Sequence, residues 1–158
     1  MNIKVVTVGK LKESALIQLC AEYEKRLGRF CKISFCELKD KSIPKNANQA
    51  QVAAVLVQEG EEILKRLSHS DYVIALCVEG KMLSSEDFAK KISDIVSVSS
   101  CIAFVIGGSL GLSDMVKSRA DFKLSLSKMT FTHNFARLFL TEQIYRAFKI
   151  GANEEYHK

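Results

Sequence analysis

The sequence has few residues that interrupt regular secondary structure, and it lacks long apolar runs. Its 158 residues include one proline, 8 glycines and no tryptophan, which leaves little room for long linkers or a second domain. No apolar run approaches the roughly 18 residues that a membrane helix needs, and the start at 1–5 lacks the longer apolar core of a signal peptide. Hydrophobic residues make up 47% of the chain, which excludes disordered and low-complexity classes. We therefore expect a single domain over residues 1–158 that stays in the cytoplasm.

Patterns for metal binding and for disulfide bonds are also missing. The five cysteines are an odd number without a Cys-x-x-Cys pair, and the three histidines are scattered along the chain. Cys31 and Cys36 would point to opposite faces of a strand, whereas zinc ligands are closely spaced on one side. We expect reduced thiols that fill a core and no metal site.

Positive charge is concentrated at the start of the chain. The net charge is +5; residues 1–45 hold ten Lys and Arg against five Asp and Glu, and residues 46–158 hold thirteen of each. A basic surface attracts phosphate polyanions, but from charge alone a solvated, soluble face is the simpler interpretation. The charge suggests a partner without naming it.

Hydrophobic periodicity predicts alternating strands and helices. Short alternating or wholly apolar runs predict strands at 2–8, 31–38, 72–78, 101–106 and 122–126. Helical spacing and capping residues predict helices at 14–27, from Asn48 to about 67, from Ser84 to 96, a short one after Ser113, and from 132 or 133 to Gly151. Five strand–helix units predict an α/β fold with a parallel sheet.

The carboxyl ends of three predicted strands should form the ligand site. Parallel sheets bind ligands at that edge, near a point where strand order reverses, and the segments that end there are 76–80, 106–111 and 126–131. The run Gly107-Gly108-Ser109-Leu110-Gly111 would let a ligand approach the backbone closely. Its spacing fits neither the dinucleotide-binding motif nor the P-loop, and a tight β-to-α turn explains it equally well.

Two further segments could carry chemistry. The hydroxyl-rich loop 124–133 could hold an adenosine by main-chain bonds, with Met129 and Phe131 closing over an apolar face. The run Tyr156-His157-Lys158 combines an aromatic ring, a titratable ring and a cation, although a frayed end is the simpler interpretation of such a position.

Several stretches of the chain resemble one family. They are Val8–Lys12, Glu22–Gly28, Gly80–Ser85, Phe104–Ser109, Leu124–Phe131, Glu142–Lys149 and Tyr156–Lys158. In this order, and over nearly the whole chain, they are similar to the ribosomal large-subunit pseudouridine methyltransferase H family (RlmH), a minimal group of SPOUT methyltransferases.

The resemblance implies an enzyme, a 23S rRNA (pseudouridine-N3)-methyltransferase. Such an enzyme uses S-adenosyl-L-methionine to methylate N3 of a pseudouridine in helix 69 of 23S rRNA within the assembled 70S ribosome. The resemblance further implies a homodimer with its active site at the subunit interface, and a sheet whose C-terminal part threads through a loop as a trefoil knot. The knot is implied by the resemblance alone. Knots are nearly absent among known folds, so the residue patterns by themselves give no reason to expect one.

The resemblance also assigns residues by position. The implied cofactor-binding residues are Leu76, Gly107, Leu126, Ser127, Lys128, Met129, Thr130 and Phe131. His157 is the candidate base and Tyr156 would stack on or orient the uracil; whether His157 removes the proton or positions the ring stays open. The candidate contacts to RNA are Arg146 and Lys158 near the site and, from the basic first segment, Lys4, Lys10 and Lys12. The last helix has apolar residues beyond one narrow stripe, which suggests a dimer surface formed by Phe135, Leu138, Phe139 and Tyr145. Thr132 stands where the family often has a proline.

Two other classes of function compete with this one. A small-molecule or nucleotide-binding α/β enzyme would share the strand–helix alternation and the glycine loop, but it explains neither the basic first segment nor the Tyr-His-Lys run. A non-catalytic ribosome-binding module would explain the charge, but not why three loops converge on one edge. Binding of S-adenosylmethionine, followed by transfer of a labelled methyl group to ribosomes, distinguishes the three.

Overall fold

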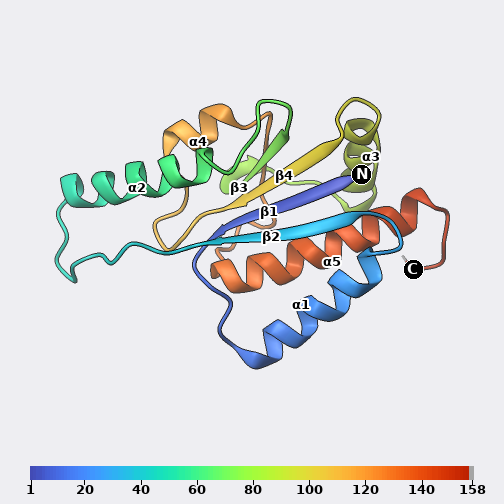
Figure 1. The fold of residues 1–158 in the computed structure, drawn as a ribbon, viewed down its shortest axis with the longest axis horizontal. Coiled ribbons are helices and arrows are strands. Elements are labelled where there is room, and N and C mark those ends of the chain that lie inside the picture. The colour runs from blue at the N-terminus through green and yellow to red at the C-terminus, as the bar shows by residue number, and fades with distance from the viewer. Residues whose placement is uncertain (157–158) are drawn as a thin grey trace.

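The computed structural model describes residues 1–156 as a parallel sheet with helices on both sides (Figure 1). Its elements in chain order are β1 (Asn2–Val8), α1 (Ser14–Leu27), β2 (Lys32–Leu38), α2 (Gln49–Leu64), β3 (Tyr72–Lys81), α3 (Ser85–Val96), β4 (Cys101–Ile106), α4 (Asp114–Arg119), β5 (Phe122–Leu124) and α5 (His133–Gly151). The strands are all parallel and lie in the order β2-β1-β4-β3-β5. The parallel α/β fold predicted from the alternating apolar segments is therefore confirmed.

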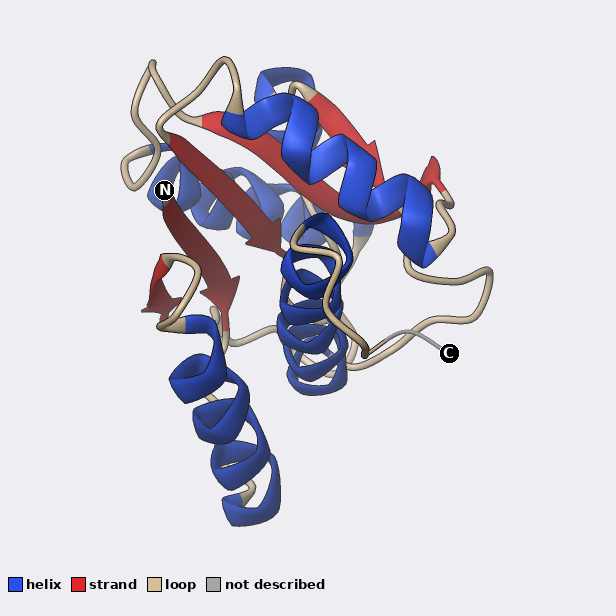
Figure 2. Ribbon diagram, turned by 90° about the vertical axis from the view of Figure 1, so that its right-hand side faces the viewer, coloured by secondary structure: helices blue, strands red, loops and turns tan. Residues whose placement is uncertain are grey.

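The helices divide between the two faces of the sheet. Helix α5 packs between α1 and α3 on one face, whereas α2 and α4 contact each other on the opposite face; Figure 2 shows both layers from the side. Along β4, the side chains of Phe104 and Ile106 enter the core under α3 and α5, and Ala103 and Val105 enter the core under α2 and α4. Burial on both faces explains why β3 and β4 are almost wholly apolar in sequence.

The element bounds agree with the sequence-based prediction within about three residues, and the difference at β3 has a consequence for the site. Predicted to end at 78, this strand continues to Lys81, since Lys81 pairs with Leu124 after a shift in register beyond Leu76. The part of β3 from 77 to 81 (the β3 extension) therefore reaches past β4 and lies beside β5. This pairing joins residues more than forty positions apart, which local periodicity does not reveal.

Side-chain caps fix where several helices begin. The side chains of Asn48 and Ser84 accept hydrogen bonds from the first turns of α2 and α3, as predicted. Thr132 accepts one from the first turn of α5, so the loop before α5 ends at a defined residue without a proline. Ser113 occupies the corresponding position of α4 without such a bond, because its hydroxyl is buried against Gly60.

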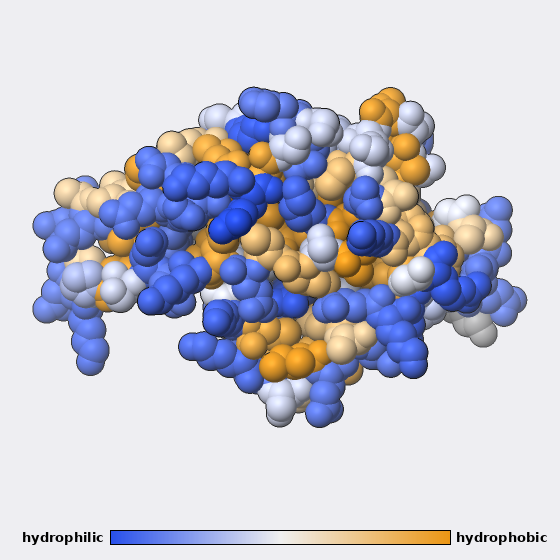
Figure 3. Space-filling model, viewed as in Figure 1, coloured by the Kyte–Doolittle hydropathy of each residue, from blue (hydrophilic) through white to orange (hydrophobic). Residues whose placement is uncertain are grey.

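Most of the exterior is polar, with local exceptions. Apolar side chains gather over α1 in the lower part of Figure 3, where Ile17 and Leu19 are close to half exposed. Phe135 and Phe139 on the outer side of α5 are exposed to a similar degree. No helix within residues 1–156 is long and apolar enough to cross a membrane.

The β3 extension crosses the chain that follows β5 at van der Waals distance. A Cβ atom on Gly80 would lie 2.6–2.8 Å from backbone atoms of Leu124 and Lys123, so only glycine fits there. Beside it, the Ser125 amide donates a hydrogen bond of 3.0 Å to the Lys81 carbonyl. The segment after β5 is thus clamped against β3; the knot implied by the resemblance stays a prediction.

Gly80→Ala should destabilise the fold by about 2 kcal/mol or more, because its methyl group meets backbone that cannot rotate away. Gly151→Ala is the matched control, since nothing lies within 4 Å of its new Cβ atom at the end of α5 and alanine favours a helix. Equilibrium unfolding in urea measures both. Equal midpoints for the two variants would contradict the close approach at Gly80.

Candidate active site

A cleft of about 390 Å³ opens at the carboxyl ends of β3, β4 and β5. This volume is typical of small-molecule sites. The chain leaves β3 toward α3 on one face of the sheet and leaves β4 toward α4 on the other, which is the kind of switch point where parallel sheets bind ligands. The cleft is lined by 76–79, 106–112, 124–127 and 129–131, with Lys117, His133 and Ala136. The three segments that the sequence placed on one edge thus meet in one cleft.

The structure brings together seven of the eight residues to which the resemblance assigns cofactor binding. Lys128 is the exception: it does not line the cleft, and its side chain is exposed. The loop around it is held by its own hydroxyl groups, because Ser125 donates to the Ser127 carbonyl (2.9 Å) and the Ser127 hydroxyl accepts from the Met129 amide (3.0 Å). These bonds give an irregular loop a fixed shape and leave its backbone beside the cleft.

The glycine run forms the opposite wall as a closed turn. The Gly111 amide donates to the Gly108 carbonyl (3.1 Å), and Gly111 has a φ of +80°, in the left-handed region that favours glycine. A Cβ atom on Gly107 would overlap the carbonyl group of Gly111. The two interpretations of this run from sequence, a ligand cradle and a tight turn, therefore describe the same loop.

Sequence reasoning gave no role to three residues that line the cleft, although Glu79 and His133 lie within the segments 76–80 and 124–133 that it singled out. His133, the first residue of α5, lies against Gly9, where a Cβ atom would be 2.6 Å from the ring Nε2. Glu79 on the β3 extension forms an ion pair with Lys117 of α4 at 2.5 Å, and both line the cleft. The sequence indicates which predicted element each of these residues belongs to. It does not indicate that the three side chains meet in one cleft, because that depends on tertiary packing.

The Glu79–Lys117 pair is fully charged at neutral pH. The hydrogen bond from Lys117 lowers the pKa of the Glu79 carboxyl below its usual range, and the same bond raises the pKa of the Lys117 ammonium. Burial raises the pKa of the neighbouring Cys77 thiol, so that thiol stays protonated. All five cysteines are free thiols, and residues 1–156 contain no group of three or more His, Cys, Asp or Glu placed to hold a metal ion.

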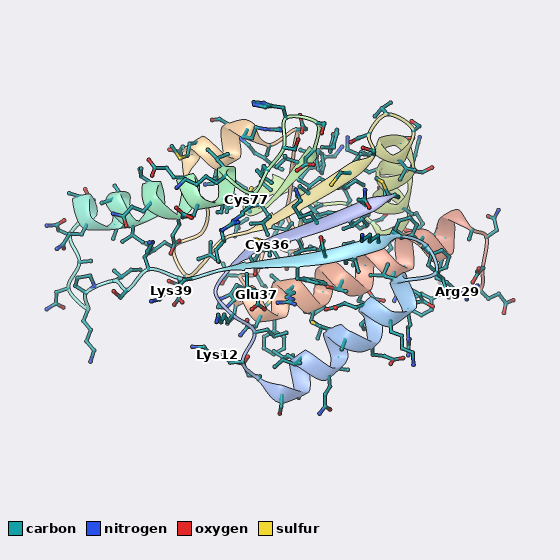
Figure 4. All side chains as sticks on the ribbon, in the orientation of Figure 1. Lys12, Arg29, Cys36, Glu37, Lys39 and Cys77 are labelled. Carbon is teal, nitrogen blue, oxygen red and sulfur yellow. The ribbon has the colours of Figure 1, made fainter. Side chains whose placement is uncertain are left out.

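The predicted RNA contacts separate into different parts of the molecule. Lys10 and Lys12 are exposed in the loop after β1, at the same end of the sheet as the cleft; Lys39 follows β2 at that end too, and Figure 4 labels it with Lys12. Lys4 is not at this end. Its ammonium lies 3.0 Å from the Asp71 carboxylate and donates to a backbone carbonyl, in a structural ion pair.

Tyr156 packs against its own chain, contrary to our expectation that the final residues contribute little to a core. The centroid of its ring lies 5.0 Å from that of Tyr145, in an edge-on contact, and 4.8 Å from the Arg146 guanidinium carbon. Its hydroxyl donates a hydrogen bond of 3.2 Å to the Glu142 carboxylate. Burial raises the pKa of the Tyr156 phenol, so it stays protonated at neutral pH. Arg146 also binds Glu142 (2.6 Å). The predicted His157 and Lys158 lie outside the described residues.

The cleft and Tyr156 lie at opposite ends of α5. His133 lines the cleft, whereas Tyr156 contacts Tyr145, twelve residues later. A rise of about 1.5 Å per residue separates these two points by about 18 Å along the helix. Tyr145 itself is buried within its own chain, so it does not belong to the exposed surface that Phe135 and Phe139 form.

Comparisons of the sequence with known proteins find relatives along almost its whole length. The family described as "Predicted SPOUT methyltransferase" matches residues 1–157. "Ribosomal RNA large subunit methyltransferase H" of Clostridioides difficile is 49% identical over 159 residues, and the protein of that name from Levilactobacillus brevis is 52% identical; each comparison covers 100% of both chains.

A solved structure has the same fold. It is that of a probable methylase family protein from Haemophilus influenzae Rd KW20, which aligns with a TM-score of 0.56 over 99% of this chain and 70% of that one. At 19% identity this likeness concerns the fold alone. The family match and the full-length relatives lead to one assignment: the chain belongs to the SPOUT methyltransferases and, among them, to the family of ribosomal RNA large subunit methyltransferase H.

Proposed function

We propose that this methyltransferase transfers the methyl group of S-adenosyl-L-methionine to N3 of a pseudouridine in helix 69 of 23S rRNA. Its substrate is the assembled 70S ribosome in the cytoplasm, and it works as a homodimer. One observation carries the proposal: seven residues assigned to cofactor binding by resemblance line a single cleft at the switch point of the sheet. The names of the full-length relatives support ribosomal RNA as the substrate.

The cleft suits an adenosine-containing methyl donor. Loop 125–131 and the Gly107–Gly111 turn offer backbone groups that can hydrogen-bond to an adenine edge, and Leu76, Ile106 and Leu126 offer apolar surface for its face. S-adenosylmethionine, when bound, supplies the electrophilic methyl group itself. The work left to the protein is to orient the acceptor nitrogen toward that group and to remove the proton from N3.

The proton on N3 needs a base other than Tyr156. A partly buried phenol that stays protonated can stack on or orient a uracil ring, but it does not accept a proton at neutral pH. The proposed base is His157, because imidazole is the side chain whose ordinary pKa lies nearest to neutral pH. Arg146 would contribute positive charge beside the uracil oxygens or a phosphate, since it already lies against the Tyr156 ring.

The proposed active site requires two copies of the chain. Tyr156 is about 18 Å from the cleft of its own subunit along α5, so a tail that closes over a cleft has to come from a second copy. Phe131, Phe135 and Phe139 form an exposed apolar surface beside the cleft, with Phe131 and Phe139 in ring contact at 5.1 Å. Such a surface is typical of a protein–protein interface.

Gly107→Val should weaken binding of S-adenosylhomocysteine at least tenfold, which is about 1.4 kcal/mol. The added side chain overlaps the Gly111 carbonyl and forces open the turn that lines the cleft. Isothermal titration calorimetry measures the affinity, with Gly151→Ala as the control that should bind like wild type. Wild-type affinity in Gly107→Val would remove this turn from the cofactor site.

Co-expression of two inactive variants should restore methyl transfer to ribosomes. If the cleft of one subunit works with the tail of the other, a mixed dimer of Gly107→Val and His157→Ala chains contains one intact site. Half of the randomly assembled dimers are mixed, so about a quarter of the wild-type activity should return. Alone, His157→Ala should lose two or more orders of magnitude in rate, and Gly107→Val should lose at least tenfold when the methyl donor is kept below the wild-type Kd. No recovery, with mixed dimers demonstrated by tag-based purification, would mean that each site belongs to one subunit.

Replacing Lys10 and Lys12 by Gln should weaken ribosome binding and flatten its dependence on salt. Each phosphate contact removed lowers the slope of log K against log salt by about one. Lys4→Gln should instead lower the stability of the fold and leave that slope unchanged, because Lys4 pairs with Asp71. Binding titrations between low and physiological salt distinguish the two. A reduced slope in Lys4→Gln would assign this residue to the RNA surface after all.

A further inference from the structure

The cleft contains one pair of opposite charges, Glu79 and Lys117, among apolar side chains, hydroxyl groups, backbone and the His133 ring. Among the residues that line it, the formally charged side chains are those of Glu79 and Lys117. They come from the β3 extension and from α4, so no local sequence relation requires them to meet. The side chain of Lys117 is 24% exposed and that of Glu79 54%, which leaves the carboxylate accessible from the open side of the cleft.

The proposed cofactor ends in a group with the matching charges. The amino-acid end of S-adenosylmethionine carries an ammonium and a carboxylate on one carbon atom, so its two charges lie about as close together as Glu79 and Lys117 do. Burying such a zwitterion without counter-charges is costly. The backbone, apolar side chains and hydroxyl groups of the wall carry no net charge, and the His133 ring reaches the cleft from α5, on the face opposite to Lys117.

We propose that Glu79 and Lys117 bind the amino-acid end of S-adenosylmethionine, the carboxylate of Glu79 accepting from its ammonium and the ammonium of Lys117 donating to its carboxylate. This inference rests on the proposed function. Because the two side chains already lie 2.5 Å apart, they meet the ligand as a preformed pair and each gains a second counter-charge on binding. Both are ionised at neutral pH, since each holds the other in its charged form.

This assignment also gives the cofactor a direction in the cleft. Lys117 reaches the cleft from α4 on one face of the sheet, and His133 and Ala136 reach it from α5 on the other. With its amino-acid end at Lys117, the cofactor has its adenosine nearer to loop 125–131. The pair therefore acts on specificity: it selects ligands that carry an α-amino acid over those that carry adenosine alone.

Two thioethers that differ only in this end provide the test. S-adenosylhomocysteine carries the amino-acid group and methylthioadenosine lacks it, so the ratio of their affinities, measured by calorimetry, isolates the contribution of the zwitterion. Wild type should bind S-adenosylhomocysteine at least tenfold more tightly. In Glu79→Gln and in Lys117→Met that preference should fall at least fivefold, while affinity for methylthioadenosine stays within twofold and thereby shows that the fold is intact.

Lys123→Met is the matched control, because Lys123 lies near Glu79 but does not line the cleft. It should keep the wild-type preference. An unchanged preference in Glu79→Gln and Lys117→Met would overturn the inference. So would equal weakening of both ligands in Glu79→Gln alone, which would mean that the carboxylate binds the ribose hydroxyls. Failure of wild type to bind either ligand would instead contradict the proposed function.

Discussion

The close approach of Gly80 to the backbone at Leu124 is the constraint on which the rest of the site depends. It fixes the segment after β5 against the β3 extension, and loop 125–131 begins directly from that clamp. Leu124, Ser125, Leu126 and Phe131 line the main cleft and also a second one of about 300 Å³ between α3 and α5. The loop is thus a partition whose position decides the shape of both cavities, and a side chain at Gly80 would displace it.

Local patterns were sufficient to predict the strands and most helix ends, because burial on both faces of β3 and β4 leaves an unmistakable apolar signature. The rule that ligands bind at the carboxyl edge then located the cleft before its residues were known to meet. What local patterns could not supply is long-range pairing. The β3 extension depends on Leu124, and the Glu79–Lys117 pair depends on how a six-residue helix packs.

The residues after α5 show a second limit of prediction from sequence. Their types suggested chemistry rather than packing, yet Tyr156 contacts Tyr145, Arg146 and Glu142 and extends the core under α5. An aromatic ring at position 156 of 158 has no periodicity that could reveal such contacts. The same packing places the ring far from the cleft of its own chain, so the proposed role of the tail depends on a second copy of the chain.

Helix α5 connects these parts of the molecule through its first two turns. His133 lines the cleft, and Arg137, one turn later, is buried with its guanidinium over the Phe35 ring at 4.1 Å. Arg137 binds Glu37 at 2.5 Å, and the same carboxylate accepts from the Leu11 amide at 3.4 Å; Figure 4 labels Glu37 between β2 and α5. The loop that carries Lys10 and Lys12 is therefore fixed relative to the cleft by a buried charge rather than by the sheet alone. Because breaking a buried pair leaves an uncompensated charge, this contact holds the loop of Lys10 and Lys12 and the first turns of α5 in one arrangement, and the proposed placement of RNA over the cleft depends on that arrangement.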